Sequence, residues 1–412
     1  MTQPPPPPPP PRLGPRPLPL HLLTQGLTLL GSHVALPHLK SGSWSWKPRL
    51  QPRATLLEAA LAAVDPQALT QALTDLGQAR IHALLDGIQA YRQHPHHRVM
   101  ADMPVVWQDG ATRLLDYSLP DATGTPVLVI PSLVNRGYIL DLSERRSLMR
   151  ALAERGLRPF LVDWGTPGPV ELSFSLDDYI LNRLNGALDA VLARAGRPAL
   201  VGYCMGGLLA LALGLWRMGA VRGLAVLATP WDFHKPHTAQ AQMIRSLGPL
   251  LEQVVLATGQ LSVDGLQTLF TTIDPAGIER KFRHFARLRP DSAKARDFVI
   301  LEDWLNDGVP LAGAVARQSL FGWYRDNLPA LGQWQVGGRF IRPQEFYRPA
   351  VAMIPQKDRI VPPESALALA EALPQVRTKI IRAGHIGMVC GSRARTDTYT
   401  PLAREIDRMV EF

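Results

Sequence analysis

The sequence predicts an α/β protein built on a mainly parallel, doubly wound sheet, with a helical insertion late in the chain. From about residue 110, short apolar runs bounded by Gly, Pro or Asp alternate with helical stretches. Parallel strands joined by helices give this pattern. The chain has 412 residues, of which 46% are hydrophobic and 19% are charged, so it can bury a substantial core. We expect one large domain over residues 101–412.

The first 45 residues differ from the rest in their proline content. The chain has 38 prolines, and an unbroken run extends from Pro4 to Pro11. Further prolines follow at Pro15, Pro17, Pro19 and Pro37. Such a segment favours the extended polyproline II conformation and has little to bury. We therefore predict a proline-rich disordered tail over residues 1–45.

Residues 46–100 are expected to form an N-terminal helical segment. Asp65 and Pro66 are typical of an N-cap followed by a first-turn proline. Apolar residues then recur mostly at steps of three and four, as on one face of a helix: Leu69, Leu73, Leu76, Ile81, Leu84, Leu85, Ile88 and Tyr91. We expect this helix to pack on the main domain.

Three histidines, His94, His96 and His97, follow that helix. They are compatible with a metal cluster or with a solvated helix end. Because no Cys or carboxylate stands at ligand spacing beside them, we favour the helix end and predict no metal site.

Six apolar runs are the predicted strands, at residues 127–130, 159–162, 199–202, 223–227, 351–354 and 378–381. Helices are expected at about 141–155, at 176–194, from 206 onward, and at 364–373. A long helical insertion, about 232–345, separates the fourth strand from the fifth, where a cap or lid would sit. Most of its aromatic residues should be core, and a minority should line an apolar acyl pocket: Phe270, Phe282, Phe285, Phe298, Trp304, Phe321, Trp323, Tyr324 and Trp334.

The segment from Gly202 to Gly207 reads Gly-Tyr-Cys-Met-Gly-Gly, directly after a predicted strand and before a predicted helix. This is the G-x-nucleophile-x-G elbow, with Cys204 where Ser is usual. Glycines avoid clashes beside such a sharp turn, and the helix N-terminus favours the thiolate. The alternative is a buried cysteine beside ordinary turn glycines. The elbow predicts an α/β-hydrolase fold, with Cys204 as the nucleophile.

In that fold the catalytic residues follow the chain order nucleophile, acid, base. Asp358 and His385 each come just after a predicted strand, at the carboxyl edge of the sheet where the elbow lies. We predict that His385 takes the thiol proton and that Asp358 holds the imidazole. Asp163 is a rival acid, but it precedes the nucleophile and is expected to be structural. Cys390 lies in a stretch of small residues, and we expect its side chain to have only a packing role.

An oxyanion hole needs two backbone N–H groups. One should come from Met205, immediately after the nucleophile. The other should come from the loop after the first predicted strand, where we predict Val134.

Composition and charge narrow the classes of function. The net charge is +9, but the basic residues are dispersed, and zinc-finger spacing, a helix-turn-helix and an aromatic-plus-basic strip are all missing from the sequence. We expect a solvated basic surface, compatible with an anionic molecule such as coenzyme A, and no nucleic-acid partner. Two cysteines are too few for a disulfide scaffold or a zinc site. The sequence shows neither a signal peptide nor a transmembrane segment, so a cytoplasmic protein is expected.

From about residue 95 to its end, the chain resembles the polyhydroxyalkanoate (poly-3-hydroxybutyrate) synthases and their synthase-like relatives. The shared motifs are residues 131–135 with 138–142, the cysteine box 202–207, residues 298–307, 337–339, 358 with 360–363, and 384–387. Residues 163–165 and 176–180 are similar to the shorter synthases that work with a second subunit, the class III branch.

The resemblance implies an acyltransferase. Cys204 would attack the thioester of a 3-hydroxyacyl-CoA, release CoA, which is a substrate group and not a cofactor, and hold the acyl group. The 3-hydroxyl of a growing polyester chain would then attack the next thioester, with Asp358 helping to activate the hydroxyl. A homodimer, a second synthase subunit and a place at the polyester granule surface are also implied. Two alternatives stay open: a thioesterase or esterase that does not polymerise, and a granule- or membrane-surface protein whose catalytic site is idle.

Overall fold

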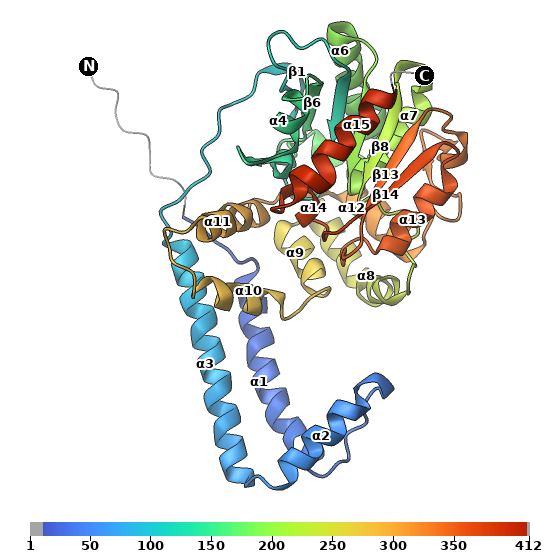
Figure 1. The fold of residues 1–412 in the computed structure, drawn as a ribbon. Coiled ribbons are helices and arrows are strands. Elements are labelled where there is room, and N and C mark those ends of the chain that lie inside the picture. The colour runs from blue at the N-terminus through green and yellow to red at the C-terminus, as the bar shows by residue number, and fades with distance from the viewer. Residues whose placement is uncertain (1–10, 410–412) are drawn as a thin grey trace, which may run out of the picture. The chain divides into compact units, whose positions relative to one another are not determined.

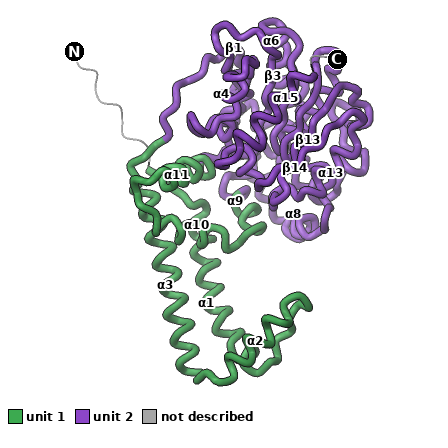
Figure 2. The backbone as a smooth tube through the Cα atoms, in the orientation of Figure 1, with its two compact units in different colours: residues 1–97, 267–306 green, residues 98–266, 307–412 purple. Residues whose placement is uncertain are grey.

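The computed structural model describes residues 11–409, and these fall into two compact units (Figure 2). Unit 1 comprises residues 11–97 and 267–306, and unit 2 comprises residues 98–266 and 307–409. Most of the proline run Pro4 to Pro11 lies outside the described residues.

Unit 2 is built on an eight-stranded sheet with the strand order β1-β2-β6-β3-β7-β8-β13-β14 (Figure 1). The pairs β1–β2 and β2–β6 are antiparallel, and all other neighbours are parallel. The strands are β1 Val105–Asp109, β2 Thr112–Asp116, β3 Pro126–Ile130, β6 Arg158–Asp163, β7 Ala199–Tyr203, β8 Gly223–Leu227, β13 Ala350–Pro355 and β14 Val376–Ile381. The predicted fold class is confirmed.

The central strands form because their residues are apolar at consecutive positions. Every residue of β3, β7, β8 and β13 is buried, as expected for parallel strands covered on both faces. The helices that pack against the sheet are α4 Leu148–Ala153, α6 Asn185–Ala195, α7 Met205–Trp216, α13 Pro363–Ala372 and α15 Thr400–Arg408. All six predicted strands are present, within two residues of their predicted ends.

The helix predicted at 141–155 is much shorter in the structure. Residues Asp141–Ser143 and Arg146–Ser147 form the hairpin β4–β5, and α4 begins only at Leu148. The reason is the buried carboxylate of Asp141, which accepts hydrogen bonds from the Tyr117 hydroxyl at 3.0 Å and from Arg150 Nε at 2.9 Å. A buried carboxylate needs such partners, and they fix Asp141 outside the helix.

Unit 1 differs from the sequence-based expectation at its start. Residues Leu18–Lys40 form the helix α1 where we expected a disordered tail. Pro17 is the N-cap and Pro19 lies in the first turn, where proline is tolerated, whereas Pro37 lies inside the last turn, where it removes a backbone hydrogen bond. α1 lies against α3 Pro66–Arg92 (Figure 1). In the segment predicted to be helical, the structure has α2 Gln51–Ala62 and α3.

The insertion is also divided differently from the expected lid. Its first and last parts belong to unit 2, namely α8 Ala239–Thr258, α12 Gly313–Arg317 and the π-helix η6 Gln318–Arg325. Residues 267–306 belong to unit 1, with α10 Gly277–Phe285 and α11 Ala293–Asn306. The helix α9 Val263–Thr271 crosses the division.

Aromatic side chains explain why α10 and α11 join the N-terminal helices. The Tyr91 ring of α3 lies 5.7 Å from that of Phe282, and Phe285 stacks on Phe298 at 4.3 Å between ring centres. The unit 1 core consists of Leu84, Ile88, Tyr91, Phe282, Phe285, Ala295 and Val299. The helix α3 therefore packs on these helices within unit 1, whereas we expected it to pack on the main domain.

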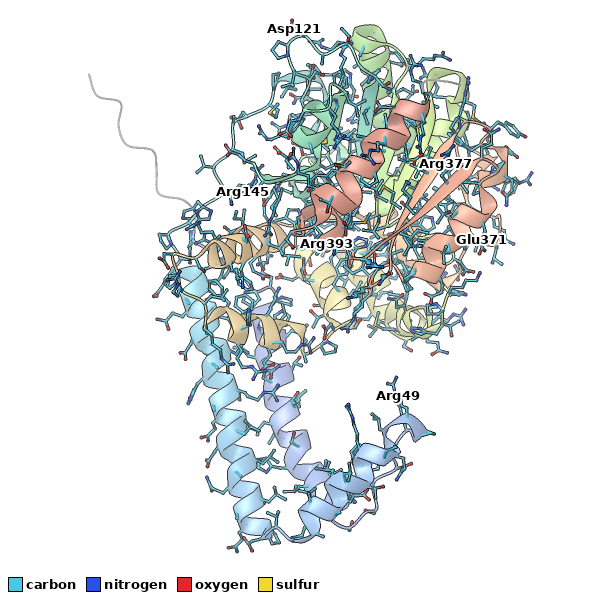
Figure 3. All side chains as sticks on the ribbon, in the orientation of Figure 1. Arg49, Asp121, Arg145, Glu371, Arg377 and Arg393 are labelled. Carbon is cyan, nitrogen blue, oxygen red and sulfur yellow. The ribbon has the colours of Figure 1, made fainter. Side chains whose placement is uncertain are left out.

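Charged side chains come from separate elements of unit 2 (Figure 3). Asp121 follows β2, Glu371 lies on α13, Arg377 on β14, and Arg393 follows α14 Gly387–Cys390.

Among residues 11–409, no helix has both the length and the hydropathy needed to cross a bilayer.

Candidate active site

Cys204 lies at the sharp turn between β7 and α7. Its backbone has φ 56° and ψ −128°, a conformation that a non-glycine residue rarely adopts. The turn is held because the Cys204 N–H donates to the Leu227 carbonyl of β8 at 2.8 Å. Strained backbone of this kind is typical of a nucleophile elbow. The structure thus places Cys204 at the N-terminus of α7.

The elbow glycines are required by close packing. A Cβ on Gly202 would lie 2.3 Å from the Gly207 Cα, and a Cβ on Gly206 would lie 2.1 Å from the Ile130 carbonyl oxygen. Neither contact is sterically possible. The glycines therefore allow α7 to begin directly against β7 and the end of β3.

His385 and Asp358 form a buried hydrogen-bonded pair. His385 Nδ1 and Asp358 Oδ2 are 2.7 Å apart. The other carboxylate oxygen, Oδ1, accepts the N–H groups of Ile360 and Val361, each at 2.9 Å. Asp358 follows β13 and His385 follows β14, so parallel strands bring both to the carboxyl edge of the sheet. With both carboxylate oxygens engaged, Asp358 is placed to orient the imidazole.

The third member of the group, Cys204, is one of the side chains that raise the pKa of the His385 imidazole. Since Nδ1 faces Asp358, Nε2 is the ring nitrogen left for the thiol. Burial disfavours a charged imidazole, but the charges and hydrogen bonds of Cys204 and Asp358 outweigh it and raise the pKa of His385. The structure brings the three predicted residues together in an arrangement that can deprotonate the thiol.

We expect the Asp358→Asn substitution to lower the pKa of His385, because it removes one of the charges that raise it. One unit of lowering corresponds to about 1.4 kcal/mol. NMR titration of the histidine ring protons would measure it, with a His385→Gln sample assigning the signal among the 11 histidines of the chain. An unchanged His385 titration would contradict the electrostatic role of Asp358.

The raised pKa of His385 also makes the free energy of unfolding depend on pH. A raised pKa means that folding favours the imidazolium, so this contribution is fully present below the ordinary value of 6.5. It is lost as the pH rises through the raised value in the folded protein. The difference in unfolding free energy between wild type and Asp358→Asn should therefore shrink on the alkaline side.

Tyr203 supports the base and was not among the predicted site residues. Its hydroxyl donates to the His385 carbonyl at 3.1 Å, and the two rings are 5.2 Å apart. Burial first, and then the charges of Cys204, Cys390 and Asp358, raise the pKa of Tyr203, so it stays a neutral donor. The sequence held no signal for this role, because any residue can occupy that position of the elbow motif.

The predicted oxyanion hole is only partly available in the structure. Met205 is the first residue of α7, directly after the nucleophile. The Val134 N–H, by contrast, donates to the Ser132 hydroxyl at 3.0 Å and so already has a partner. The cause is the local turn: Ser132 reaches its own backbone two residues on, as Ser commonly does in loops.

The rival residues are engaged elsewhere. Asp163 forms an ion pair with Arg113, and it accepts the Gly165 N–H at 3.1 Å. Cys390 is buried, and its thiol donates to the Ile386 carbonyl at 3.3 Å. These partners fit the structural roles predicted for both residues.

The three histidines after α3 lie in unit 1. His94 is buried and its Nε2 is 2.9 Å from the Pro290 carbonyl oxygen, while Arg12 binds the carbonyls of His94 and His96. Within residues 11–409, no group of three His, Cys, Asp or Glu side chains is arranged to hold a metal ion.

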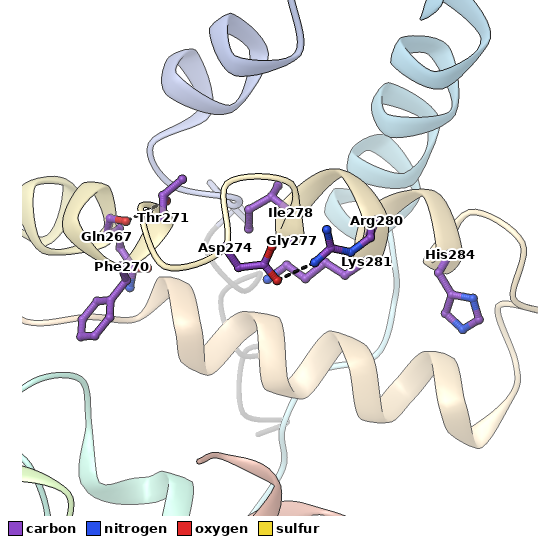
Figure 4. A pocket seen from close by; sticks show the side chains of 9 residues that line it. All are labelled: Gln267, Phe270, Thr271, Asp274, Gly277, Ile278, Arg280, Lys281 and His284. Atoms are coloured by element: carbon purple, nitrogen blue, oxygen red, sulfur yellow. Dashed lines mark hydrogen bonds and ion pairs between the residues drawn. The ribbon is translucent and has the colours of Figure 1, made fainter. Parts of the chain in front are cut away.

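Unit 1 also has an open hollow of about 570 Å³ along α9 and α10 (Figure 4). Two cationic side chains line the hollow and form ion pairs. Arg280 pairs with Asp274, and Lys281 pairs with the buried Glu302 at 2.6 Å. Burial raises the pKa of Glu302. None of the predicted catalytic residues lines this hollow.

Comparisons with known proteins identify the family to which the chain belongs. Residues 127–396 match the family model described as "Alpha/beta hydrolase family", and this range contains Cys204, Asp358 and His385. The chain is 31% identical to the "Poly(3-hydroxyalkanoate) polymerase subunit PhaC" of Synechocystis sp. over 66% of this chain and 75% of that protein.

Two further relatives have the same name. The protein from Haloferax mediterranei is 28% identical, and the match spans 72% of this chain but only 61% of that longer relative. The protein from Allochromatium vinosum is 27% identical over 68% of this chain and 79% of its own length. The chain therefore belongs to the α/β-hydrolase family and, within it, to the poly(3-hydroxyalkanoate) polymerase family.

Proposed function

We propose that this chain is an acyltransferase that polymerises 3-hydroxyacyl-CoA into polyhydroxyalkanoate through an acyl group held on Cys204. The observation that carries the proposal is Cys204 on its strained elbow, together with the buried and hydrogen-bonded His385–Asp358 pair whose imidazole Cys204 influences. This group lies in the part of the chain that matches the α/β-hydrolase family model. The names of the polymerase relatives supply the substrate class.

The first half-reaction is acylation of the cysteine. His385 Nε2 accepts the thiol proton, and the thiolate sulfur attacks the thioester carbonyl to give a tetrahedral oxyanion. The oxyanion collapses, the bond to the CoA sulfur breaks, and His385 returns the proton to the leaving thiolate. One thioester bond forms as another breaks, so this step is close to isoenergetic.

The second half-reaction is transfer to a hydroxyl. The 3-hydroxyl of a growing chain attacks a thioester carbonyl, an ester bond forms, the thiolate leaves, and the hydroxyl proton passes to the imidazole. Asp358 has both oxygens engaged, by His385 and by two backbone N–H groups. This supports activation of the hydroxyl by Asp358 through His385 rather than by direct contact.

The second candidate is a hydrolase that uses the same three residues. The α/β-hydrolase family model, taken alone, supports a hydrolase as well as it supports an acyltransferase. In that reaction water would replace the 3-hydroxyl as the acceptor, and a free hydroxy acid would be the product.

The test is an assay of the purified chain with 3-hydroxybutyryl-CoA, in which free thiol and turbidity are recorded together. Thiol release with rising turbidity is the expected result, because the polyester is insoluble while CoA is not. Thiol release in clear solution, with one free hydroxybutyrate per CoA, would establish the hydrolase instead. If no thiol is released either alone or with a synthase subunit partner, both candidates fail.

The polymerase relatives are named as subunits, which supports a second synthase subunit as a partner of this chain. We also propose that the chain forms a homodimer. Light scattering of the purified chain would measure the mass in solution. The proposal also places the protein at the surface of polyester granules, which sedimentation of the chain with its product would test.

A further inference from the structure

The helix α1 of unit 1 exposes a row of large apolar side chains, which we call the α1 stripe. It consists of Leu23, Leu27, Leu30 and Val34. These side chains are between 58% and 72% exposed. Their spacing of four, three and four residues places them on one face of the helix. Leu29, on another side of α1, is instead in close contact with Gly77 of α3.

Such exposure is unusual for a helix of this composition. α1 has 23 residues, among which Lys40 is the only Lys, Arg, Asp or Glu, and His21 is the only buried residue. A helix with so few charged residues is normally buried. Contiguous apolar side chains left exposed on a folded protein commonly mark an interaction surface. The α1 stripe is therefore expected to be covered by a partner.

The helix α2 contacts α1 and adds both apolar and cationic side chains (Figure 1). Leu56 of α2 is 73% exposed, and Trp44, in the segment before α2, is 44% exposed. Three exposed cations lie around the start of α2, and we call them the α2 cations: Lys47, Arg49 and Arg53 (Figure 3). Within residues 11–409, none of the three forms an ion pair.

The charge of this part of the chain indicates the chemistry of the partner. Residues 11–57 contain no Asp or Glu, although the whole chain has 35 of them. In a symmetric dimer the same surface of a second copy would face this one, and it would offer no carboxylate to the α2 cations. Anionic lipid headgroups would neutralise them. Leu and Trp combined with Lys and Arg are typical of segments that lie in a membrane interface.

We propose that the α1 stripe and the α2 cations form a binding surface for a phospholipid membrane with anionic headgroups. α1 lies in the plane of the interface, its stripe enters the boundary of the acyl chains, and the α2 cations contact the headgroups. The attraction thus has an apolar part and an electrostatic part, carried by different residues. The inference does not rest on the proposed function, because no residue of this surface belongs to the catalytic group.

The test is sedimentation of the full chain with vesicles, from which the partition coefficient between lipid and solution is obtained. One set of vesicles contains phosphatidylglycerol and phosphatidylcholine, and the other contains phosphatidylcholine alone. The stripe variant, Leu23→Gln/Leu27→Gln/Leu30→Gln, should weaken binding to the anionic vesicles about 10²-fold, because three buried leucines are lost. Glutamine favours helix, and the sites are exposed, so α1 should still form. Circular dichroism checks this.

The electrostatic part is tested by the cation variant, Lys47→Gln/Arg49→Gln/Arg53→Gln. Each cation near an anionic membrane surface strengthens binding severalfold, so this variant should also bind the anionic vesicles about 10²-fold more weakly. Wild type should bind phosphatidylcholine alone much more weakly than the anionic vesicles. Equal wild-type binding to both sets of vesicles, or full binding by the cation variant, would overturn the assignment to anionic lipid.

The matched control substitutes three leucines of unit 2 that are 50%, 65% and 61% exposed: Leu119→Gln/Leu250→Gln/Leu331→Gln. Its binding should match wild type, since the number and kind of changes are the same and only their place differs. Equal weakening of the control and the stripe variant would overturn the inference, as would failure of wild type to sediment with anionic vesicles.

Light scattering distinguishes a second copy of the chain as the occupant. A wild type that is dimeric and does not bind vesicles, beside a monomeric stripe variant, would show that a second copy covers the α1 stripe, and the lipid proposal would be rejected. Without vesicles, CoA release by the stripe variant should stay within twofold of wild type. Absence of CoA release in every sample would reject the proposed function and leave the vesicle result unaffected.

Discussion

The Cys204→Ala variant should lose CoA release from 3-hydroxybutyryl-CoA by about 10⁶-fold. That is the size of loss seen when the nucleophile of a comparable catalytic triad is removed. The physical reason is that alanine has no atom that can hold the acyl group, so His385 and Asp358 have no thiol to activate. The measurement is free thiol over time, with the intact protein analysed by mass spectrometry for an acyl adduct.

The chain supplies its own control in its second cysteine. Cys390→Ala should retain CoA release within about twofold, because the Cys390 thiol is buried and donates to a backbone carbonyl of its own helix. The adduct should appear in Cys390→Ala and be missing in Cys204→Ala. An adduct that persists in Cys204→Ala, or that vanishes only in Cys390→Ala, would show that the nucleophile is misassigned.

The second large effect is expected for Asp358→Asn, which should lower kcat for CoA release by about 10⁴-fold. An amide in place of the acid partner of a catalytic histidine costs about this much in a comparable triad, since it favours the wrong tautomer of the imidazole. Here Asp358 Oδ2 lies 2.7 Å from His385 Nδ1. The backbone N–H groups of Ile360 and Val361 also lose a charged acceptor.

Asp163→Asn is the matched control for this substitution. Asp163 pairs with Arg113 across β2 and β6 and caps the turn at Gly165. Loss of its charge should cost at most about 1 kcal/mol of stability, as for a partly exposed ion pair, and should leave kcat within twofold. The reverse ranking of the two variants would identify Asp163 as the acid.

The strands and the elbow were predictable from local sequence because their signals are short in range. Continuous apolar runs such as 223–227 mark buried parallel strands, and a glycine on each side of Cys204 marks the turn. The chain order of Cys204, Asp358 and His385 then followed from the fold. The antiparallel strands β1 and β2 were not predicted, because they are only partly buried and lack a continuous apolar run.

The tail and the insertion were less predictable because their packing partners are distant in sequence. Proline content indicated disorder up to residue 45, yet residues 18–40 are helical. Pro17 and Pro19 stand at the start of this helix, where proline is tolerated, and Pro37 lies inside its last turn. The aromatic residues 282, 285 and 298 were expected in a lid. They pack instead on Leu84, Ile88 and Tyr91, about 200 residues earlier in the chain.

The sequence by itself determined the fold class, the identity of the nucleophile candidate and the chain order of its partners, because each depends on local pattern and on the rules of parallel sheets. Only the tertiary structure decided which hydrogen-bond donors around the site are already engaged. The Val134 N–H is occupied by Ser132, while the Tyr203 hydroxyl reaches the His385 carbonyl. Those outcomes depend on contacts between residues far apart in sequence, which local pattern does not encode.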